Sequence, residues 1–301
     1  MAESFSELFN RFVPEPLKNV VDEVLASKEH GEFLSHLDAV RDCINSLSET
    51  VEKCQFEEPD TRATFPAKLR NALRTYYLAL NSRLIALELA RNGDALSVQN
   101  QNASNVAQFW WLLPGPSQGD KYFKTYCAIV RLNLLNNAWI AFESSLDALY
   151  EAKESEAKKD QHRNQTFRGV NKILTSYDIE ASDIERIKSK LHEGHISIVT
   201  KQRPFFRGEY VAERDKNQDR QFLEFFGTLR NTMHNNGVSF KTADFETGIG
   251  TFSVEQGKAV DFATPDLCLA MIKELSSVFE AFTTRTEDIE SVIDVYVEQN
   301  P

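Results

Sequence analysis

The sequence of 301 residues lacks the marks of several common protein classes. Its first residues have neither the basic region nor the apolar region of a secretory signal. No uninterrupted apolar run approaches the thickness of a bilayer. The chain also contains no Walker loop, no dinucleotide-binding glycine fingerprint and no zincin motif. We therefore expect a cytoplasmic protein that does not enter a membrane and that uses no cofactor.

Cysteine is scarce and is not arranged for disulfides or metal. The four cysteines lie far apart, each within an apolar helical pattern, and form no Cys-x-x-Cys pair: Cys43, Cys54, Cys127 and Cys268. We interpret them as reduced core thiols of a cytoplasmic protein. His192 and His195 have a spacing that can share a metal, but no other cluster of ligands has a complementary spacing. We predict no metal site.

Basic residues are outnumbered, since 34 Lys and Arg stand against 45 Asp and Glu, a net charge of −11. This balance argues against broad, salt-sensitive wrapping of nucleic acid, so any RNA would need a local basic surface. The best candidate carries Lys201, Arg203 and Arg207 with Phe205-Phe206 between them, as a single-stranded RNA track would. Acidic residues are mixed into the same run, and a solvated loop is the alternative.

Apolar residues recur at spacings of three and four along most of the chain, which predicts a mainly α fold, a multi-helix bundle. Two such patterns run from Phe33 to Cys54 and from Thr64 to Leu87, and they fold most simply into an antiparallel hairpin. The Gln- and Asn-rich stretch Ser97–Asn105, followed by Trp110-Trp111 and Pro114-Gly115-Pro116, is the best boundary. We predict an amino-terminal helical region over 1–115 and a second helical domain over 120–301.

The longest helical pattern runs from Lys121 to about Ala152 and has apolar residues on more than one stripe, so this helix should be central. Polar groups embedded in such a helix need partners. We place Glu143 near Arg230, as a brace for the guanidinium. The alternative is an exposed Glu143 without a role.

After Gly237 the apolar period changes and predicts a small antiparallel β-hairpin or three-stranded sheet near 238–262. Within it, Ile249–Val254 and Lys258–Phe262 flank Glu255-Gln256-Gly257 and are expected to pair. Thr264-Pro265-Asp266 then starts the last helix.

The strongest chemical signal is the stretch Leu229-Arg230-Asn231-Thr232-Met233-His234-Asn235-Asn236-Gly237. Asp219 or a neighbour can start a helix that Asn235-Asn236-Gly237 ends. Arg230 and His234 then share one face of the final turn. His234 can move a proton while Arg230 steadies charge on a phosphate, which suits phosphodiester cleavage without metal. Alternatively, Arg230 pairs with a carboxylate on a neighbouring helix, and His234 and Asn235 tie the helix end to backbone carbonyls.

This stretch, preceded by a helix with Phe142-Glu143-Ser144-Ser145-Leu146-Asp147 and followed by short strands, resembles the HEPN superfamily of helical prokaryotic proteins. The resemblance covers about 120–301. Asn231 fits the family's habit of placing a polar residue after the arginine. Asn231, Thr232 and Met233 separate Arg230 from His234, a shorter interval than the family usually has.

Many HEPN proteins are RNases of toxin-antitoxin and antiphage systems. The resemblance therefore implies a homodimer in which Arg230 and His234 of both chains line one cleft, with Asn231, Asn235 and Glu143 in support. It implies metal-independent attack by the ribose 2′-hydroxyl, and control by an antitoxin or another defence-system protein. The competing hypothesis is a non-catalytic helical interaction module with a HEPN-like fold, which uses the amino-terminal hairpin or the small sheet.

Overall fold

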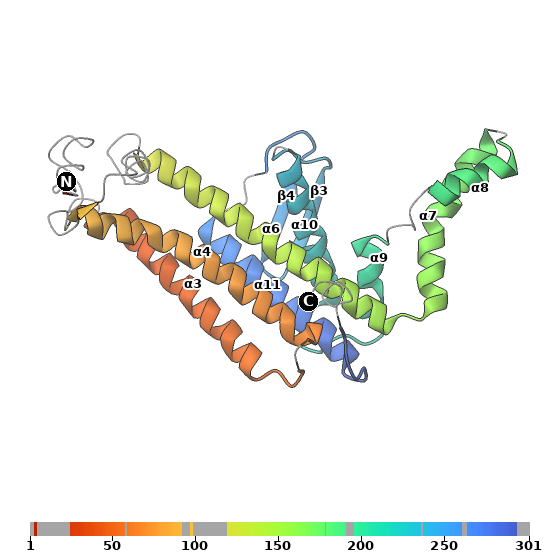
Figure 1. Ribbon diagram of the computed structural model, residues 1–301, viewed down its shortest axis with the longest axis horizontal. Helices are drawn as coiled ribbons and strands as arrows, with labels where there is room; N and C mark the ends of the chain where they lie inside the picture. Colours follow the sequence, from red (N-terminus) through yellow and green to blue (C-terminus); the bar gives the residue numbers. More distant parts are fainter. Residues whose placement is uncertain are drawn as a thin grey trace. The chain divides into compact units, whose positions relative to one another are not determined.

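The computed structural model describes residues 3–4, 25–57, 59–91, 97–98, 119–177, 179–190, 196–235, 237–260 and 264–293. Within these ranges the protein is mainly helical, with a small antiparallel β-hairpin (Figure 1). The predicted fold class is confirmed. None of the helices in these ranges combines the length and the apolar character needed to cross a membrane.

The helices are α3 (Lys28–Glu52), α4 (Thr61–Arg91), α6 (Gly119–Lys153), α7 (Glu156–Ser176), α8 (Ala181–Lys190), α9 (Ile198–Gln202), α10 (Lys216–His234) and α11 (Pro265–Thr283). The short 3-10 helices η3 (Arg203–Phe206) and η4 (Thr284–Thr286) follow α9 and α11. Strand β1 (Glu3–Ser4) pairs antiparallel with β2 (Ser97–Val98), and β3 (Ala243–Thr247) pairs antiparallel with β4 (Gly250–Val254).

These elements form two compact units, each assembled from separate parts of the chain. The first comprises Met1–Glu52, Ala67–Ala138 and Ala259–Lys273, and the second comprises Lys53–Pro66, Trp139–Lys258 and Glu274–Pro301. Helices α4, α6 and α11 contribute residues to both units. The division into 1–115 and 120–301 stays a prediction, and the Trp110-Trp111 pair lies outside the described residues.

The first unit contains the predicted helical hairpin of α3 and α4, which lie side by side (Figure 1). Phe33, early in α3, lies 5.0 Å from the guanidinium of Arg83, late in α4. His36, which follows Phe33 in α3, has its Nε2 atom 2.9 Å from the hydroxyl of Tyr76, which precedes Arg83 in α4. These contacts run in opposite directions along the two helices, so the antiparallel arrangement is confirmed. The apolar stripe that drives this packing is buried as expected: Leu37, Val40, Cys43, Leu47, Leu69, Leu73 and Leu80.

The second unit is built on an aromatic core. Trp139 of α6 stacks on Phe226 of α10 with ring centroids 5.1 Å apart, and Phe142 lies 6.2 Å from Phe282 of α11. A Cβ atom on Gly227 would lie 3.2 Å from Trp139 Cζ2. Glycine at this position therefore allows α10 to approach the indole closely, and it fixes the position of α10 against α6.

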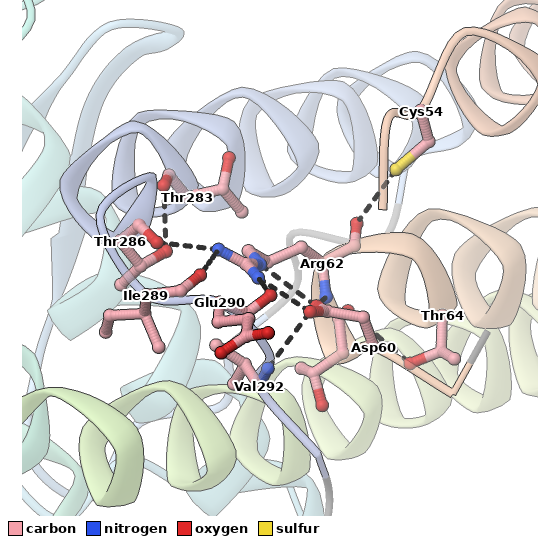
Figure 2. A network of polar contacts seen from close by, with 10 residues as sticks. Cys54, Asp60, Arg62, Thr64, Thr283, Thr286, Ile289, Glu290 and Val292 are labelled. Carbon is pink, nitrogen blue, oxygen red and sulfur yellow. Dashed lines mark hydrogen bonds and ion pairs between the residues drawn. The ribbon is translucent and has the colours of Figure 1, made fainter. Parts of the chain in front are cut away.

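A buried ion pair anchors the last described residues of the second unit (Figure 2). Arg62 Nη2 lies 2.7 Å from Asp60 Oδ2, and both side chains are buried. The Asp60 carboxylate also accepts from the backbone N–H of Val292. The remaining guanidinium donors reach backbone carbonyls, those of Thr286, Ile289 and Glu290. Because these partners satisfy both charges, the pair is stable inside the protein.

The predicted pairing of Ile249–Val254 with Lys258–Phe262 is wrong. Strand β4 pairs instead with β3, which precedes it. Gly250 adopts φ 137°, and the Thr247 hydroxyl donates to its carbonyl at 2.8 Å, so a tight turn joins the two strands. Phe245 and Phe252 then both pack on Phe225 of α10, at centroid distances of 5.6 and 4.3 Å. This apolar contact with α10 fixes the register.

Candidate functional site

The candidate site lies on α10, whose two ends are capped by local chemistry. The helix begins at Lys216, and its N-cap is Asp215, whose carboxylate accepts from the backbone N–H groups of Asn217 and Gln218. The predicted start at or beside Asp219 is therefore too late. Asn235 is the C-cap, as expected, and Gly237 has φ 78° and donates its N–H to the Thr232 carbonyl at 2.8 Å.

Arg230 lies half-buried near the end of α10. Its Nη1 donates to Asn231 Oδ1 at 3.2 Å, at the surface. Its Nε is buried and has no hydrogen-bond partner. Among the described residues, no carboxylate forms an ion pair with it. The guanidinium therefore carries a charge with donors still available, which is the state that an anion-binding arginine requires.

Two of the three basic residues predicted to bind RNA differ from Arg230, because carboxylates neutralise them. Lys201 Nζ lies 2.6 Å from Asp147, and Arg207 Nη1 lies 2.8 Å from Glu154. Arg203 is exposed and has no ion-pair partner in the described part of the chain. Phe205, expected between these cations as a base-stacking ring, is buried and stacks on Phe282 at 4.9 Å. Of the predicted RNA-binding residues, Arg203 alone thus offers an uncompensated charge.

The residues predicted to support Arg230 lie in different environments. Asn231 is exposed beside it. Asn235 Nδ2 donates to the Val238 carbonyl at 3.0 Å and holds the helix end. Glu143 is half-buried on α6, and no described side chain pairs with it, Arg230 included. His234 is the last residue of α10, and its side chain lies outside the described part of the structure.

A cleft of about 760 Å³ opens beside the same helix. We call it the α10 cleft; Trp139 lies at its base and α9, α10 and β3 form its walls. Its polar and aromatic lining includes Gln202, Arg220, Thr228, Asn231, Phe240 and Lys241. Asn231 therefore borders both Arg230 and the cleft. Sequence analysis missed this cleft, although Glu224, Thr228 and Asn231 recur at helical spacing and mark one face of α10.

A buried polar network fixes the start of α10 and was also missed. Asp219 accepts from the Tyr210 hydroxyl at 2.6 Å and from both Nε and Nη2 of Arg214, at 2.9 and 2.7 Å. Arg214 Nη2 also lies 2.7 Å from Glu274 of α11. Hydrogen bonding to Asp219 raises the pKa of Arg214, and burial together with the same carboxylate raises the pKa of Tyr210. The network therefore orients α10 and adds no proton donor at neutral pH.

No group of three or more His, Cys, Asp or Glu side chains that could hold a metal ion occurs among the residues described. His192 and His195 lie outside them. The four cysteines are free, and burial raises the pKa of the Cys268 thiol to about 12.

Compared with known proteins, the chain matches no family model, no curated protein and no solved structure.

Proposed function

We propose that this protein is a metal-independent endoribonuclease of the HEPN type that uses Arg230 and His234. The state of Arg230 is the observation that supports the proposal: it is half-buried, its Nε lacks a partner, and no described carboxylate neutralises it. Lys201, Arg207 and Arg214 are paired with carboxylates. A phosphate that approaches the end of α10 therefore meets an unneutralised charge at Arg230.

In the proposed reaction, the 2′-hydroxyl of a ribose attacks the adjacent phosphorus. The hydroxyl proton passes to the neutral imidazole of His234 as the O2′–P bond forms. The P–O5′ bond breaks, and the leaving oxygen takes a proton from His234 of the second chain. The products are a 2′,3′-cyclic phosphate and a 5′-hydroxyl end. Arg230 stabilises the charge that gathers on the phosphate oxygens.

The assembly required by this chemistry is a homodimer in which two α10 helices bring Arg230 and His234 of both chains to one cleft. We place the enzyme in the cytoplasm as a toxin or antiphage effector, controlled by an antitoxin or a defence-system protein. Light scattering after size-exclusion chromatography is expected to give the mass of two chains. A monomer at all concentrations would remove this mechanism.

Cleavage of cellular RNA in EDTA tests the activity. His234→Ala is expected to slow cleavage by about 100-fold or more, the usual effect of losing a general acid or base. Arg230→Ala is expected to slow it by about 100- to 1,000-fold, as for other charge-stabilising donors. The control is Arg186→Ala on α8, an exposed arginine 3.5 Å from Asp183, which should cleave like wild type. Undiminished cleavage by His234→Ala, or none by wild type, contradicts the proposal.

The competing function is a non-catalytic helical interaction module, and the capping bond of Asn235 favours it, since part of the motif already has a structural role. Thermal unfolding separates the two functions. A large loss of stability in the Arg230→Ala and His234→Ala variants favours the structural role. An unchanged melting temperature with lost cleavage favours catalysis.

A further inference from the structure

The α10 cleft has the size of a small-molecule site. Its volume of about 760 Å³ lies within the range of roughly 300–1,000 Å³ typical of ligand pockets. The base is apolar, because Trp139 and Phe245 are buried there. The walls are polar, through Gln202 on α9 and Thr228 and Asn231 on α10. An apolar base with a few polar groups suits a flat, heteroatom-bearing ring.

Gln202 presents an unpartnered carboxamide to the cleft. The residue is 5% exposed and lines the cleft, and its side-chain amide forms no hydrogen bond within the described part of the chain. Neither polar atom of this amide is among the fully buried atoms without a partner, so its carbonyl and NH2 groups reach solvent and are available to a molecule in the cleft. Carboxamides present a donor and an acceptor side by side, the pattern that reads the edge of a nucleobase.

Asn231, on α10, supplies a second carboxamide to the cleft lining. Its Oδ1 accepts from Arg230 Nη1, and its Nδ2 has no partner among the described residues. Because one side chain borders both the cleft and the guanidinium, a ligand in the cleft lies next to the proposed phosphate site. A nucleotide has this geometry, with a base and a phosphate joined by one sugar.

The cleft mouth carries an exposed ring and an uncompensated cation. Phe240 is 66% exposed, and Arg220 is exposed without an ion-pair partner in the described residues. The other cation of the lining, Lys241, is bound to Glu224 at 2.7 Å. Single-stranded nucleic acid is bound by rings that stack on bases beside cations that contact phosphates. Phe240 and Arg220 provide one of each.

We infer that the α10 cleft is a nucleotide subsite for single-stranded RNA, in which one base enters between Gln202 and Asn231 and its neighbour stacks on Phe240. Arg220 contacts a phosphate on the side away from Arg230. This inference rests on the proposed RNA-cleaving function and names its substrate class: unpaired RNA, with base preference set by Gln202.

The test measures binding separately from cleavage. Fluorescein-labelled oligoribonucleotides of A, C, G or U are titrated in EDTA into His234→Ala, and fluorescence anisotropy reports the affinity. A second substitution in this variant, Phe240→Ala, should weaken binding by about 5- to 150-fold, because one stacked base is lost. The matched control adds Tyr177→Ala, another ring that is 74% exposed, and should not change the affinity. Adding Gln202→Leu should narrow the spread of affinities among the four oligonucleotides.

Equal affinities in the Phe240→Ala and Tyr177→Ala variants overturn the subsite, even if wild type cleaves RNA. Phe240-dependent binding without any cleavage by wild type supports the subsite and rejects the ribonuclease. Duplex RNA that binds as tightly as the single strand also overturns the inference. So does loss of self-association in Phe240→Ala with unchanged RNA affinity, because the ring would then belong to an interface between two copies of the chain.

Discussion

At the residue scale, the second unit shows how differently one side-chain type behaves in different surroundings. Arg62 and Arg214 lie in buried or partly buried networks with every charge matched by a carboxylate. Arg230 forms no ion pair with a carboxylate among the described residues. A matched arginine contributes to stability, whereas an unmatched one is free to bind an anion. This contrast is the reason that we propose a functional role for Arg230 and a structural role for Arg62 and Arg214.

Removing the acid from the Arg214 network should be costly. Asp219→Ala leaves Arg214 and the Tyr210 hydroxyl without their main acceptor, in a site where the carboxylate is 3% exposed. We expect the free energy of unfolding in urea to fall by about 3 kcal/mol. The control is Asp183→Ala, since its pair with Arg186 is exposed, and should cost less than about 1 kcal/mol. Equal losses would show that the Asp219 network is no more stabilising than a surface pair.

Acid should weaken the anchor at Asp60. Burial alone would raise its pKa, but hydrogen bonds from Arg62 and the Val292 N–H hold it below the ordinary value of 3.8. A carboxyl whose folded pKa is depressed stabilises the fold above its unfolded pKa, and this stability is lost as the pH falls through the folded pKa. The stability difference between wild type and Asp60→Asn should be full at neutral pH and shrink below pH 3.8. A difference that stays constant in urea unfolding across this window contradicts the assignment.

At the element scale, the end of α10 depends on backbone conformation. A Cβ atom on Gly237 would meet nothing within 4 Å, yet its φ of 78° disfavours any other residue. Gly237→Ala should therefore lower the free energy of unfolding by about 1 kcal/mol. Gly31 in α3 also has open space around it but no positive φ, so Gly31→Ala should stabilise by about 0.5–1 kcal/mol. Chemical denaturation of both variants should give opposite signs, and the same sign would contradict the capping role.

At the scale of the whole molecule, the charge of −11 limits how the protein can bind RNA. If the proposed function holds, few phosphates are contacted. The arginines that we predict or propose to contact RNA, and that have no ion-pair partner among the described residues, are Arg203, Arg220 and Arg230. Each phosphate contact with a single strand contributes about −0.7 to the slope of log affinity against log salt. We expect a slope no steeper than about −3 for each chain, and Arg220→Ala should reduce it by about 0.7. A much steeper slope would indicate an extended basic track.

The helices could be predicted because their signal is local. Apolar residues at spacings of three and four predict α3, α4, α6 and α11, because side chains three or four residues apart lie on the same face of a helix. Asn235 and Gly237 predict the end of α10. The hairpin could be predicted only as a region, because strand pairing was decided by Phe245 and Phe252 packing on Phe225. Periodicity alone does not contain that contact.

The sequence by itself thus determined the mainly helical class and the placement of Arg230 and His234 on one helical turn. Tertiary structure alone decided which cations remain uncompensated, because Lys201 pairs with Asp147 on α6 and Arg207 pairs with Glu154 just after it, both far away in the sequence. It also decided where the cleft lies, since Gln202, Asn231 and Phe240 meet only after α9, α10 and the hairpin pack together. Charge matching and cavity walls depend on distances across the fold, which no spacing along the chain specifies.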